Sequence, residues 1–231
     1  MFKNIFSRHI TLTPSLPVVN AGCSQFEVNN WALSDFVVSK LIPFTGTTPF
    51  PLNELLLMSG ALLRFQPDHL FEWGTHIGKS ARIFYETVRT FNIHCTIHTI
   101  ELPDEVAHVE HPGRQYAVLI RNMPQIRKYR GDGLEESFRI ARSMHTKTRF
   151  MFFLDGDHSY TSVHRELDAI VHKFPLACII LHDTFFQSAD SGYNIGPYQA
   201  IETALKSNSE KYQVIHTATG LPGMTLLYPR R

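Results

Sequence analysis

Residues 69–91, HLFEWGTHIGKSARIFYETVRTF, decide the fold class of this sequence. The first five residues, His69–Trp73, are bulky and mostly apolar, which is typical of a short strand. A loop with two glycines follows, and from Ser80 to Phe91 apolar residues recur at the spacing of one helical face. A strand that leads through a glycine loop directly into a helix is the repeating unit of a parallel α/β sheet.

The alternation of strands and helices continues to the end of the chain. Continuous apolar runs such as 149–155 (RFMFFLD) and 177–183 (ACIILHD) are typical of strands that are buried on both faces of a sheet. We expect further strands at 94–100, 126–129, 212–217 and 223–229, and helices at 134–144, 161–174 and 197–206. The predicted fold class is therefore α/β, a doubly wound and mostly parallel sheet with helices on both faces.

The N-terminal part of the chain lacks this alternation. Residues 1–29 show no sustained period, whereas residues 30–42 could form a short helix with Trp31 on its apolar side. The segment PFTGTTPFP is expected to end that helix, and Pro51 opens a second one. The predicted division of the chain is an N-terminal arm and helical cap, residues 1–67, and a main domain, residues 68–231. We expect the cap to cover a ligand pocket or to form the contact of a homodimer.

The composition argues against several classes of protein. Of 231 residues, 43% are hydrophobic and 19% are charged, as in ordinary globular chains. The net charge of +1 provides no general attraction for nucleic acid, so a nucleic-acid partner is not expected. The three scattered cysteines form no disulfide framework, and no apolar run reaches the ~18 residues of a membrane span. We expect a cytoplasmic protein without a membrane partner.

Acidic residues follow the predicted core strands one after another. The carboxyl ends of parallel strands meet at one edge of an open α/β sheet, and ligands bind in the crevice outside that edge. The side chains expected there are Glu72, Glu101, Asp132, Asp155, Asp157, His158, His182 and Asp183. A purely structural sheet has no reason to collect carboxylates along one edge, so the pattern indicates a binding site.

The glycine loop differs from two phosphate-binding patterns. A P-loop needs four residues between its glycines, whereas three separate Gly74 from Gly78. A dinucleotide-binding loop needs a glycine where His76 stands. Glu72 and Glu101 would repel a triphosphate but attract a positively charged nucleoside. S-adenosylmethionine meets this requirement, and Glu101 stands near the usual position of a ribose-binding acid.

Five elements carry a resemblance to a known family. They are FEWGTHIGKSA (71–81), the strand-ending Glu101, RGDGLEE (130–136), FLDGDHSYTSVHRELD (153–168) and IILHDT (179–184). In this order they resemble class I S-adenosylmethionine-dependent methyltransferases. The DGDHSY and HDT elements resemble the small-molecule O-methyltransferases of the macrocin and sugar or phenol type, and cephalosporin-hydroxylase-like proteins. The resemblance covers about residues 68 to 228, and it implies a Rossmann-like sheet of seven strands whose last strand is antiparallel.

The resemblance also implies which residues bind S-adenosylmethionine. The methionine part would lie against Glu72 and the glycine loop, the ribose against Glu101, and the adenine against Asp132 and Gly133. The complete cofactor-binding set is Glu72, Gly74, Thr75, Gly78, Ser80, Glu101, Asp132, Gly133 and Asp155. Lys79 is interpreted as a solvated residue of the first helical turn.

In metal-dependent relatives, acids after the fourth and fifth strands bind Mg²⁺. The matching residues are Asp155 and Asp183, with His182 where relatives often have a second carboxylate. Because Mg²⁺ prefers oxygen ligands, this departure leaves open whether Mg²⁺ or no metal is bound. His182 could equally be a packed structural histidine.

Methyl transfer to oxygen requires removal of a proton from the acceptor. His158 is the preferred general base, because its ordinary pKa lies near neutral pH. Asp157 is the rival candidate, although an acid at a turn often caps the helix that follows. Asp155 completes the candidate catalytic set.

The sequence thus predicts a methyltransferase acting on a small hydroxylated acceptor such as a sugar, a phenol or another natural product. The segment between Phe185 and Pro197 is expected to line the acceptor pocket. Two alternatives stay open: a regulatory module that binds a nucleoside without catalysis, and a methyltransferase that acts on RNA or protein.

Overall fold

A seven-stranded sheet forms the centre of the protein, with the strand order β3-β2-β1-β4-β5-β7-β6. The computed structural model describes residues 25–106, 115–217 and 219–230. The strands are β1 (His69–Trp73), β2 (Thr96–Glu101), β3 (Ile126–Arg130), β4 (Phe150–Leu154), β5 (Cys178–His182), β6 (Tyr212–His216) and β7 (Met224–Pro229). β7 runs antiparallel to β5 and β6, whereas the other pairs are parallel. The predicted fold, including its antiparallel last strand, is confirmed.

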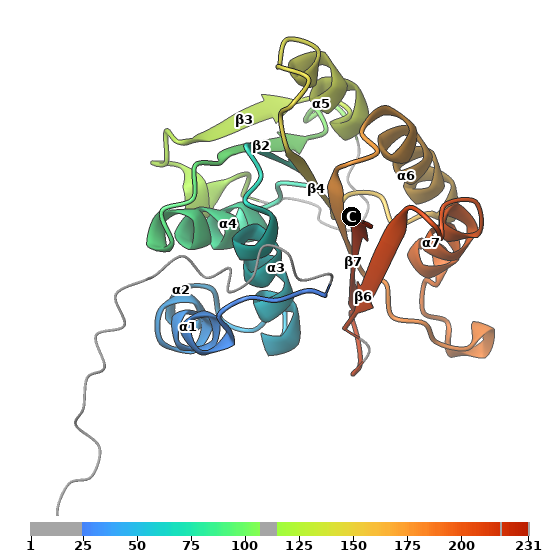
Figure 1. The fold of residues 1–231 in the computed structure, drawn as a ribbon, viewed down its shortest axis with the longest axis horizontal. Helices are drawn as coiled ribbons and strands as arrows, with labels where there is room; N and C mark the ends of the chain where they lie inside the picture. Colours follow the sequence, from blue (N-terminus) through green and yellow to red (C-terminus); the bar gives the residue numbers. More distant parts are fainter. Residues whose placement is uncertain (1–24, 107–114, 218, 231) are drawn as a thin grey trace, which may run out of the picture.

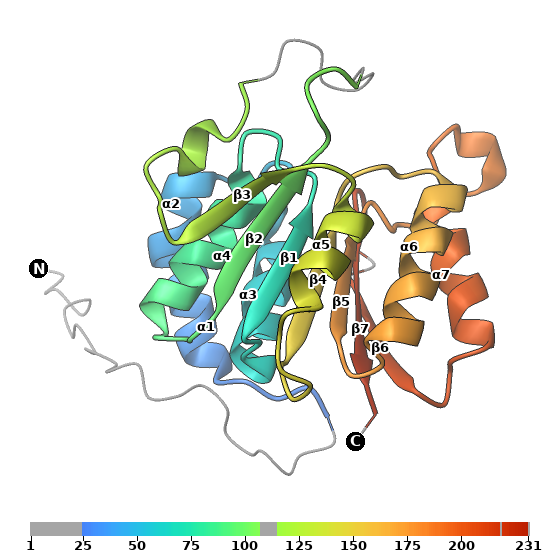
Figure 2. The same ribbon diagram turned by 90° about the horizontal axis from the view of Figure 1, so that it is seen from above.

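Helices cover both faces of this sheet (Figure 1). The longer helices are α1 (Asn30–Phe36), α3 (Leu52–Phe65), α4 (Lys79–Thr90), α5 (Gly133–Ala141), α6 (Tyr160–Lys173) and α7 (Gly196–Lys206). Shorter helical segments are η1 (Val37–Leu41), α2 (Ile42–Thr45), η2 (Val118–Ile120) and η3 (Ala189–Ser191). Figure 2 shows α1, α3 and α4 on one face, and α5, α6 and α7 on the other.

Successive side chains of each central strand enter different hydrophobic layers, because strand side chains alternate between faces. In β4, Met151 and Phe153 join the layer beneath α3 and α4, whereas Phe152 and Leu154 join the layer beneath α6 and α7. Both layers are closely filled, so the strands are held rigidly. The sheet therefore fixes the positions of the loops at its carboxyl edge.

The prediction for residues 30–42 was wrong in its details. The helical path continues past Pro43 to Thr45, and its middle section, η1, is a π-helix. Proline donates no backbone hydrogen bond and crowds the preceding turn, and the wider π-turn accommodates it. Trp31, expected on the apolar side, is 85% exposed.

The N-terminal segment is partly described. Residues 1–24 of the predicted arm lie outside the described residues. The hydrophobic side chains of α3 pack into the same layer as the strands. The boundary between residues 67 and 68 stays a prediction. None of the helices in the described parts of the chain could span a lipid bilayer.

Candidate active site

The candidate site lies at the carboxyl ends of β1, β2, β4 and β5. The glycine loop after β1 packs directly against the end of β4. Gly74 has φ 96°, and a Cβ atom built on it would lie 2.1 Å from the carbonyl oxygen of Asp155. Only glycine allows both this backbone conformation and this contact. The loop ends at Gly78, the left-handed residue before α4.

Glu72 is fully buried at the end of β1. Neither of its carboxyl oxygens has a hydrogen-bond partner among the described residues. Burial raises the pKa of Glu72 to about 8; the hydroxyls of Ser80 and Thr99 lie close enough to lower it in part, although neither makes a well-formed hydrogen bond with the carboxyl group. A buried carboxyl without partners is costly, which indicates that it is kept for a ligand.

Glu101 ties the glycine loop to the end of β2. Its carboxylate accepts hydrogen bonds from the backbone N–H groups of His76, at 2.8 Å, and Leu102, at 3.1 Å. The Thr75 hydroxyl pairs with that of Thr99 at 2.6 Å, which makes a second link between loop and β2. A carboxylate oxygen has two lone pairs, so Glu101 retains capacity to accept from a ribose hydroxyl.

Asp132 has two structural contacts. Its side chain accepts the backbone N–H of Glu135 and thereby caps α5, and it forms an ion pair with Arg165 at 2.9 Å. A Cβ atom on the neighbouring Gly133 would meet the Trp73 ring at 2.4 Å, so this turn fits closely over β1. These contacts leave an adenine-binding role for Asp132 and Gly133 as a prediction.

Lys79 is not the solvated residue that the sequence suggested. Its ammonium group donates hydrogen bonds to the carbonyl oxygens of Thr45 and Thr48, and the side chain is half-buried. Lys79 therefore fastens the N-terminal segment to the start of α4. The sequence could not show this contact, because its partners are backbone carbonyls more than 30 residues away.

Four side chains from the ends of β4 and β5 form one cluster: Asp155, His158, His182 and Asp183. Their ligand-type atoms all lie within 4.8 Å of one another. His182 Nδ1 lies 2.9 Å from Asp155 Oδ1, and His158 Nε2 lies 3.2 Å from Asp183 Oδ2. Asp183 has φ 55°, an uncommon conformation for a residue with a side chain, and such strain is concentrated at functional sites.

Glu54 of α3 joins this cluster, and the sequence interpretation missed it. It is fully buried, and its Oε2 lies 3.1 Å from His182 Nε2. The sequence did contain one sign that Glu54 has a special role. Glu54 and Arg64 are the only charged residues between Leu52 and Phe65. A charge on a helix that is apolar on most sides calls for a specific partner.

Charges inside the cluster shift its pKa values strongly. Burial disfavours the charged forms, but the His182 charge and the hydrogen bonds from His158 and His182 hold the pKa of Asp155 at about 2. Burial likewise acts against charge on His182, but Asp155, Asp183 and Glu54 outweigh it and raise the pKa of His182 to about 12. The cluster therefore places an imidazolium among carboxylates.

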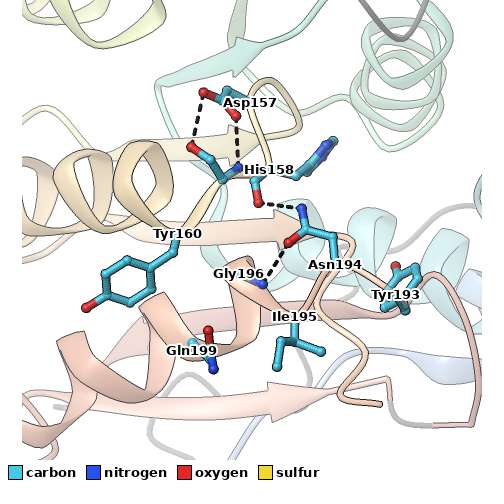
Figure 3. A pocket seen from close by; sticks show the side chains of 9 residues that line it. Asp157, His158, Tyr160, Tyr193, Asn194, Ile195, Gly196 and Gln199 are labelled. Carbon is cyan, nitrogen blue, oxygen red and sulfur yellow. Dashed lines mark hydrogen bonds between the residues drawn. The ribbon is translucent and has the colours of Figure 1, made fainter. Parts of the chain in front are cut away.

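Asp157 is not part of this cluster and makes local hydrogen bonds. Its carboxylate accepts the Ser159 N–H at 2.8 Å and the Ser159 hydroxyl at 3.2 Å (Figure 3). It also accepts the Ser162 hydroxyl at 2.6 Å, and these bonds hold the start of α6. The N-cap of α6 is Ser159, whose hydroxyl accepts the Ser162 N–H, so Asp157 supports the cap and is not itself the helix cap that the sequence suggested. A catalytic role of Asp157 stays a prediction.

A cavity of about 570 Å³ opens beside His158 (Figure 3). It lies between the start of α6 and the segment that leads into α7, and its lining includes Tyr193 to Gly196 from the segment expected to contact the acceptor. The Tyr193 hydroxyl lies 3.0 Å from Asp183 Oδ1, and Asn194 binds the His158 carbonyl oxygen. The cavity and the cluster thus share His158, and Tyr193 links the cavity lining to Asp183.

The fold matches those of several solved methyltransferases. An O-methyltransferase from Bacillus cereus in complex with S-adenosylhomocysteine shares 12% identity over 86% of this chain and 90% of its own, with a TM-score of 0.55. TomG from Streptomyces achromogenes, an O-methyltransferase involved in tomaymycin synthesis and solved with S-adenosylmethionine, shares 15% over 87% and 89%, with a TM-score of 0.55.

A putative caffeoyl-CoA O-methyltransferase from Staphylococcus aureus shares 16% identity over 87% of this chain and 99% of its own, also with a TM-score of 0.55. No protein-family model and no curated protein matches the sequence. At these identities the likeness establishes the fold. The chain has the Rossmann-like fold of class I S-adenosylmethionine-dependent methyltransferases, as the resemblance implied.

Proposed function

We propose that this protein is an O-methyltransferase that transfers a methyl group from S-adenosylmethionine to a hydroxyl of a small acceptor. The observation that carries the proposal is Glu72, a buried and unpartnered carboxyl at the carboxyl end of β1. A positively charged ligand explains why an acid without a partner stands there. The methyltransferase fold makes S-adenosylmethionine the best candidate for that ligand.

The residues of the site fit this methyl donor. Gly74 and Gly78 let the loop pack against the Asp155 backbone and the Ile120 side chain, Glu72 can face a cationic group, and Glu101 can accept a ribose hydroxyl. When bound, S-adenosylmethionine supplies a methyl group on a positively charged sulfur; the bond from sulfur to carbon breaks as the bond from the acceptor oxygen to carbon forms. Thr75 and Ser80 are buried supports of the same loop.

His158 acts as the general base in this proposal. His158 is one of the residues that line the cavity, and its buried Nε2 lies 3.5 Å from Asp155 Oδ1 and 3.2 Å from Asp183 Oδ2. The two carboxylates stabilise the imidazolium that forms when His158 takes the acceptor proton. They also hold the ring in place, so that the acceptor oxygen is aligned for displacement at carbon.

A divalent cation also fits near these residues. Asp155 and Asp183 offer oxygen donors, with the ring nitrogen of His182 beside them. Mg²⁺ fits this set poorly, because it prefers an all-oxygen shell. A cation held there would supply positive charge beside the acceptor oxygen. The proton transfer to His158 does not depend on it.

The acceptor is proposed to be aromatic or sugar-like. A second cavity, of about 540 Å³, shares Tyr160 and Gln199 with the first and is also lined by Phe186 and Tyr198. Flat aromatic side chains bury rings efficiently, and the polar groups among them can orient hydroxyls. Together the two cavities would accept a small molecule larger than a single ring.

Calorimetric titration with S-adenosylhomocysteine tests the binding step, and radiolabelled methyl transfer to a panel of phenols, sugars and glycosides tests the reaction. His158→Ala should retain S-adenosylhomocysteine binding and lose about 10²–10⁴-fold in turnover. His172→Ala, on the exposed side of α6, is the matched control and should behave as wild type. Absence of S-adenosylhomocysteine binding would refute the proposal.

The same assays separate the alternatives. A regulatory module would bind S-adenosylhomocysteine but transfer a methyl group to no acceptor. The wild type and His158→Ala would then both lack methyl-transfer activity. A methyltransferase acting on RNA would bind RNA with a steep dependence on salt, which the net charge of +1 does not favour.

A further inference from the structure

Glu54 contacts the candidate site from a helix, whereas the other residues of the cluster lie at or after the ends of β4 and β5. It belongs to α3, near the end of the N-terminal segment, and its side chain is fully buried. Phe50, just before α3, packs edge-on against the His182 ring with centroids 4.7 Å apart. Glu54 and Phe50 both contact the buried ring of His182.

The two ring nitrogens of His182 therefore have different surroundings. Nε2 faces Glu54 Oε2 at 3.1 Å. Nδ1 faces Asp155 Oδ1 at 2.9 Å and Asp183 Oδ2 at 3.5 Å. A carboxylate oxygen accepts hydrogen bonds, so the Nε2–Oε2 contact is satisfied when Nε2 carries a proton and donates it to Glu54. Nδ1 is then the nitrogen that faces the cluster.

This arrangement is typical of histidines that bind metals. A metal-binding histidine usually donates its second ring N–H to a carboxylate, which fixes the tautomer and the ring orientation. Glu54 is such a carboxylate, and its other oxygen has no partner among the described residues. Nδ1 and the two aspartate oxygens lie within 4.8 Å of one another, close enough for one ion to reach all three.

The donor set indicates which metals fit. Two carboxylate oxygens and one imidazole nitrogen suit divalent manganese, iron, cobalt or zinc, whereas Mg²⁺ is bound by oxygen. His158 differs from His182 because it borders the open cavity, where a base must meet the acceptor. Asp155, His182 and Asp183 are therefore the three protein ligands of interest.

We propose that Glu54 is a positioning residue that presents His182 Nδ1 as a ligand, so that Asp155, His182 and Asp183 bind a divalent transition metal in preference to Mg²⁺. The inference rests on the proposed function for the place of the acceptor, but the metal site itself stands on the cluster. A metal that enters at Nδ1 displaces the proton there and takes over its positive charge.

Titration with CoCl₂, followed by the visible absorption of bound Co²⁺, tests this proposal directly, with MgCl₂ as competitor. The wild-type chain should bind Co²⁺, and only a large excess of Mg²⁺ should displace it. Glu54→Gln, which retains an acceptor for Nε2–H but no charge, should weaken Co²⁺ binding about 10-fold, and Glu54→Ala up to about 100-fold.

Glu86→Gln is the matched control. Glu86 is also a nearly buried helical glutamate, but its partners are Arg82 and Arg89 instead of the cluster. This variant should bind Co²⁺ as the wild type does. Circular dichroism establishes that each variant is folded before its affinity is compared.

His182→Asp tests the choice of metal. It replaces the nitrogen donor with oxygen and should shift the ratio of Co²⁺ to Mg²⁺ affinity at least about tenfold toward Mg²⁺. Imidazole ¹⁵N resonances, followed during titration with Zn²⁺, should show coordination at His182 Nδ1 and a retained proton on Nε2. That pattern is a signature that a merely structural role of Glu54 would not produce.

Three results would overturn the inference: no Co²⁺ binding at millimolar concentration, equal Co²⁺ affinity in wild type and Glu54→Gln, or an unchanged metal preference in His182→Asp. Metal binding with the predicted Glu54 dependence, but without S-adenosylhomocysteine binding, would instead refute the proposed function alone.

Discussion

At the scale of single residues, Glu72 links ligand binding to pH. Its pKa is raised to about 8 by burial, so in the free protein it is mostly protonated at neutral pH. A cationic ligand favours the ionised carboxylate, and binding must therefore release a proton below pH 8. The affinity for S-adenosylmethionine is expected to rise with pH, by up to about tenfold per pH unit, and to level off near pH 8.

Calorimetry at several pH values, in buffers with different ionisation enthalpies, measures both the affinity and the released proton. Glu72→Gln should bind more weakly, by about 1.5–3 kcal/mol, with no pH dependence from this position. A pH-independent wild-type affinity between about pH 6 and pH 8 would contradict the assignment of Glu72 to the ligand.

The same carboxyl should make the unliganded protein less stable at alkaline pH. A carboxyl whose pKa is higher in the folded than in the unfolded state binds its proton more tightly when folded, so stability falls as pH rises from about 4.5 to about 8. Glu72→Gln removes this penalty and should be stabilised relative to wild type by up to about 5 kcal/mol above pH 8.

Urea denaturation of both proteins at about pH 5 and pH 8.5 measures this difference. The two stability curves should converge at the acidic end and separate toward the alkaline end. Parallel curves would mean that Glu72 is not desolvated in solution. Together with the binding data, the result would show a residue that costs stability in exchange for affinity.

At the scale of helices and strands, the sequence predicted most of the main domain. β1 was predicted residue for residue, because the glycine loop and the run His69–Trp73 leave little freedom. Acids at the strand ends were placed at one edge, because parallel topology forces those ends together. Such arguments depend only on the order of elements along the chain.

Contacts made across the chain by the N-terminal helices could not be predicted in this way. Glu54 meets His182, a residue 128 positions later, because α3 packs on one face of the sheet with its first turn beside the end of β5. Lys79 meets Thr45 and Thr48 for the same reason. Neither contact follows from periodicity or from strand-end position, since both depend on how α3 and the preceding loop are docked on the domain.

Lys79 therefore has a different expected phenotype from a solvated lysine. Lys79→Ala removes two charge-assisted hydrogen bonds to the 45–48 segment and should lower the free energy of unfolding by about 1–2 kcal/mol, because the side chain is only half-buried. Its affinity for S-adenosylhomocysteine should stay close to that of wild type, since no ligand contact is proposed for it. Chemical denaturation measures the free energy of unfolding, and calorimetry measures the affinity for S-adenosylhomocysteine. Wild-type stability in Lys79→Ala would show that the contacts with Thr45 and Thr48 are weak in solution.

At the scale of the whole molecule, the helices before residue 68 and the sheet share one hydrophobic layer. Leu55 and Leu62 of α3 are fully buried in the same cluster as Met151 and Phe153 of β4. Buried side chains that contact both parts couple their unfolding. We therefore expect α3 and the sheet to unfold together, even though the sequence suggested a separate cap.

Leu62→Ala provides the test. Loss of this buried side chain should cost about 2–5 kcal/mol, and native-state hydrogen exchange should show the same loss of protection for slowly exchanging amides of α3 and of β4. Leu176→Ala, at a position 82% exposed, is the control and should change neither. If only the amides of α3 lose protection, α3 is a separate cap. Glu54 would then reach His182 from an element that opens independently, and metal affinity should fall with the stability of α3 while the sheet stays folded.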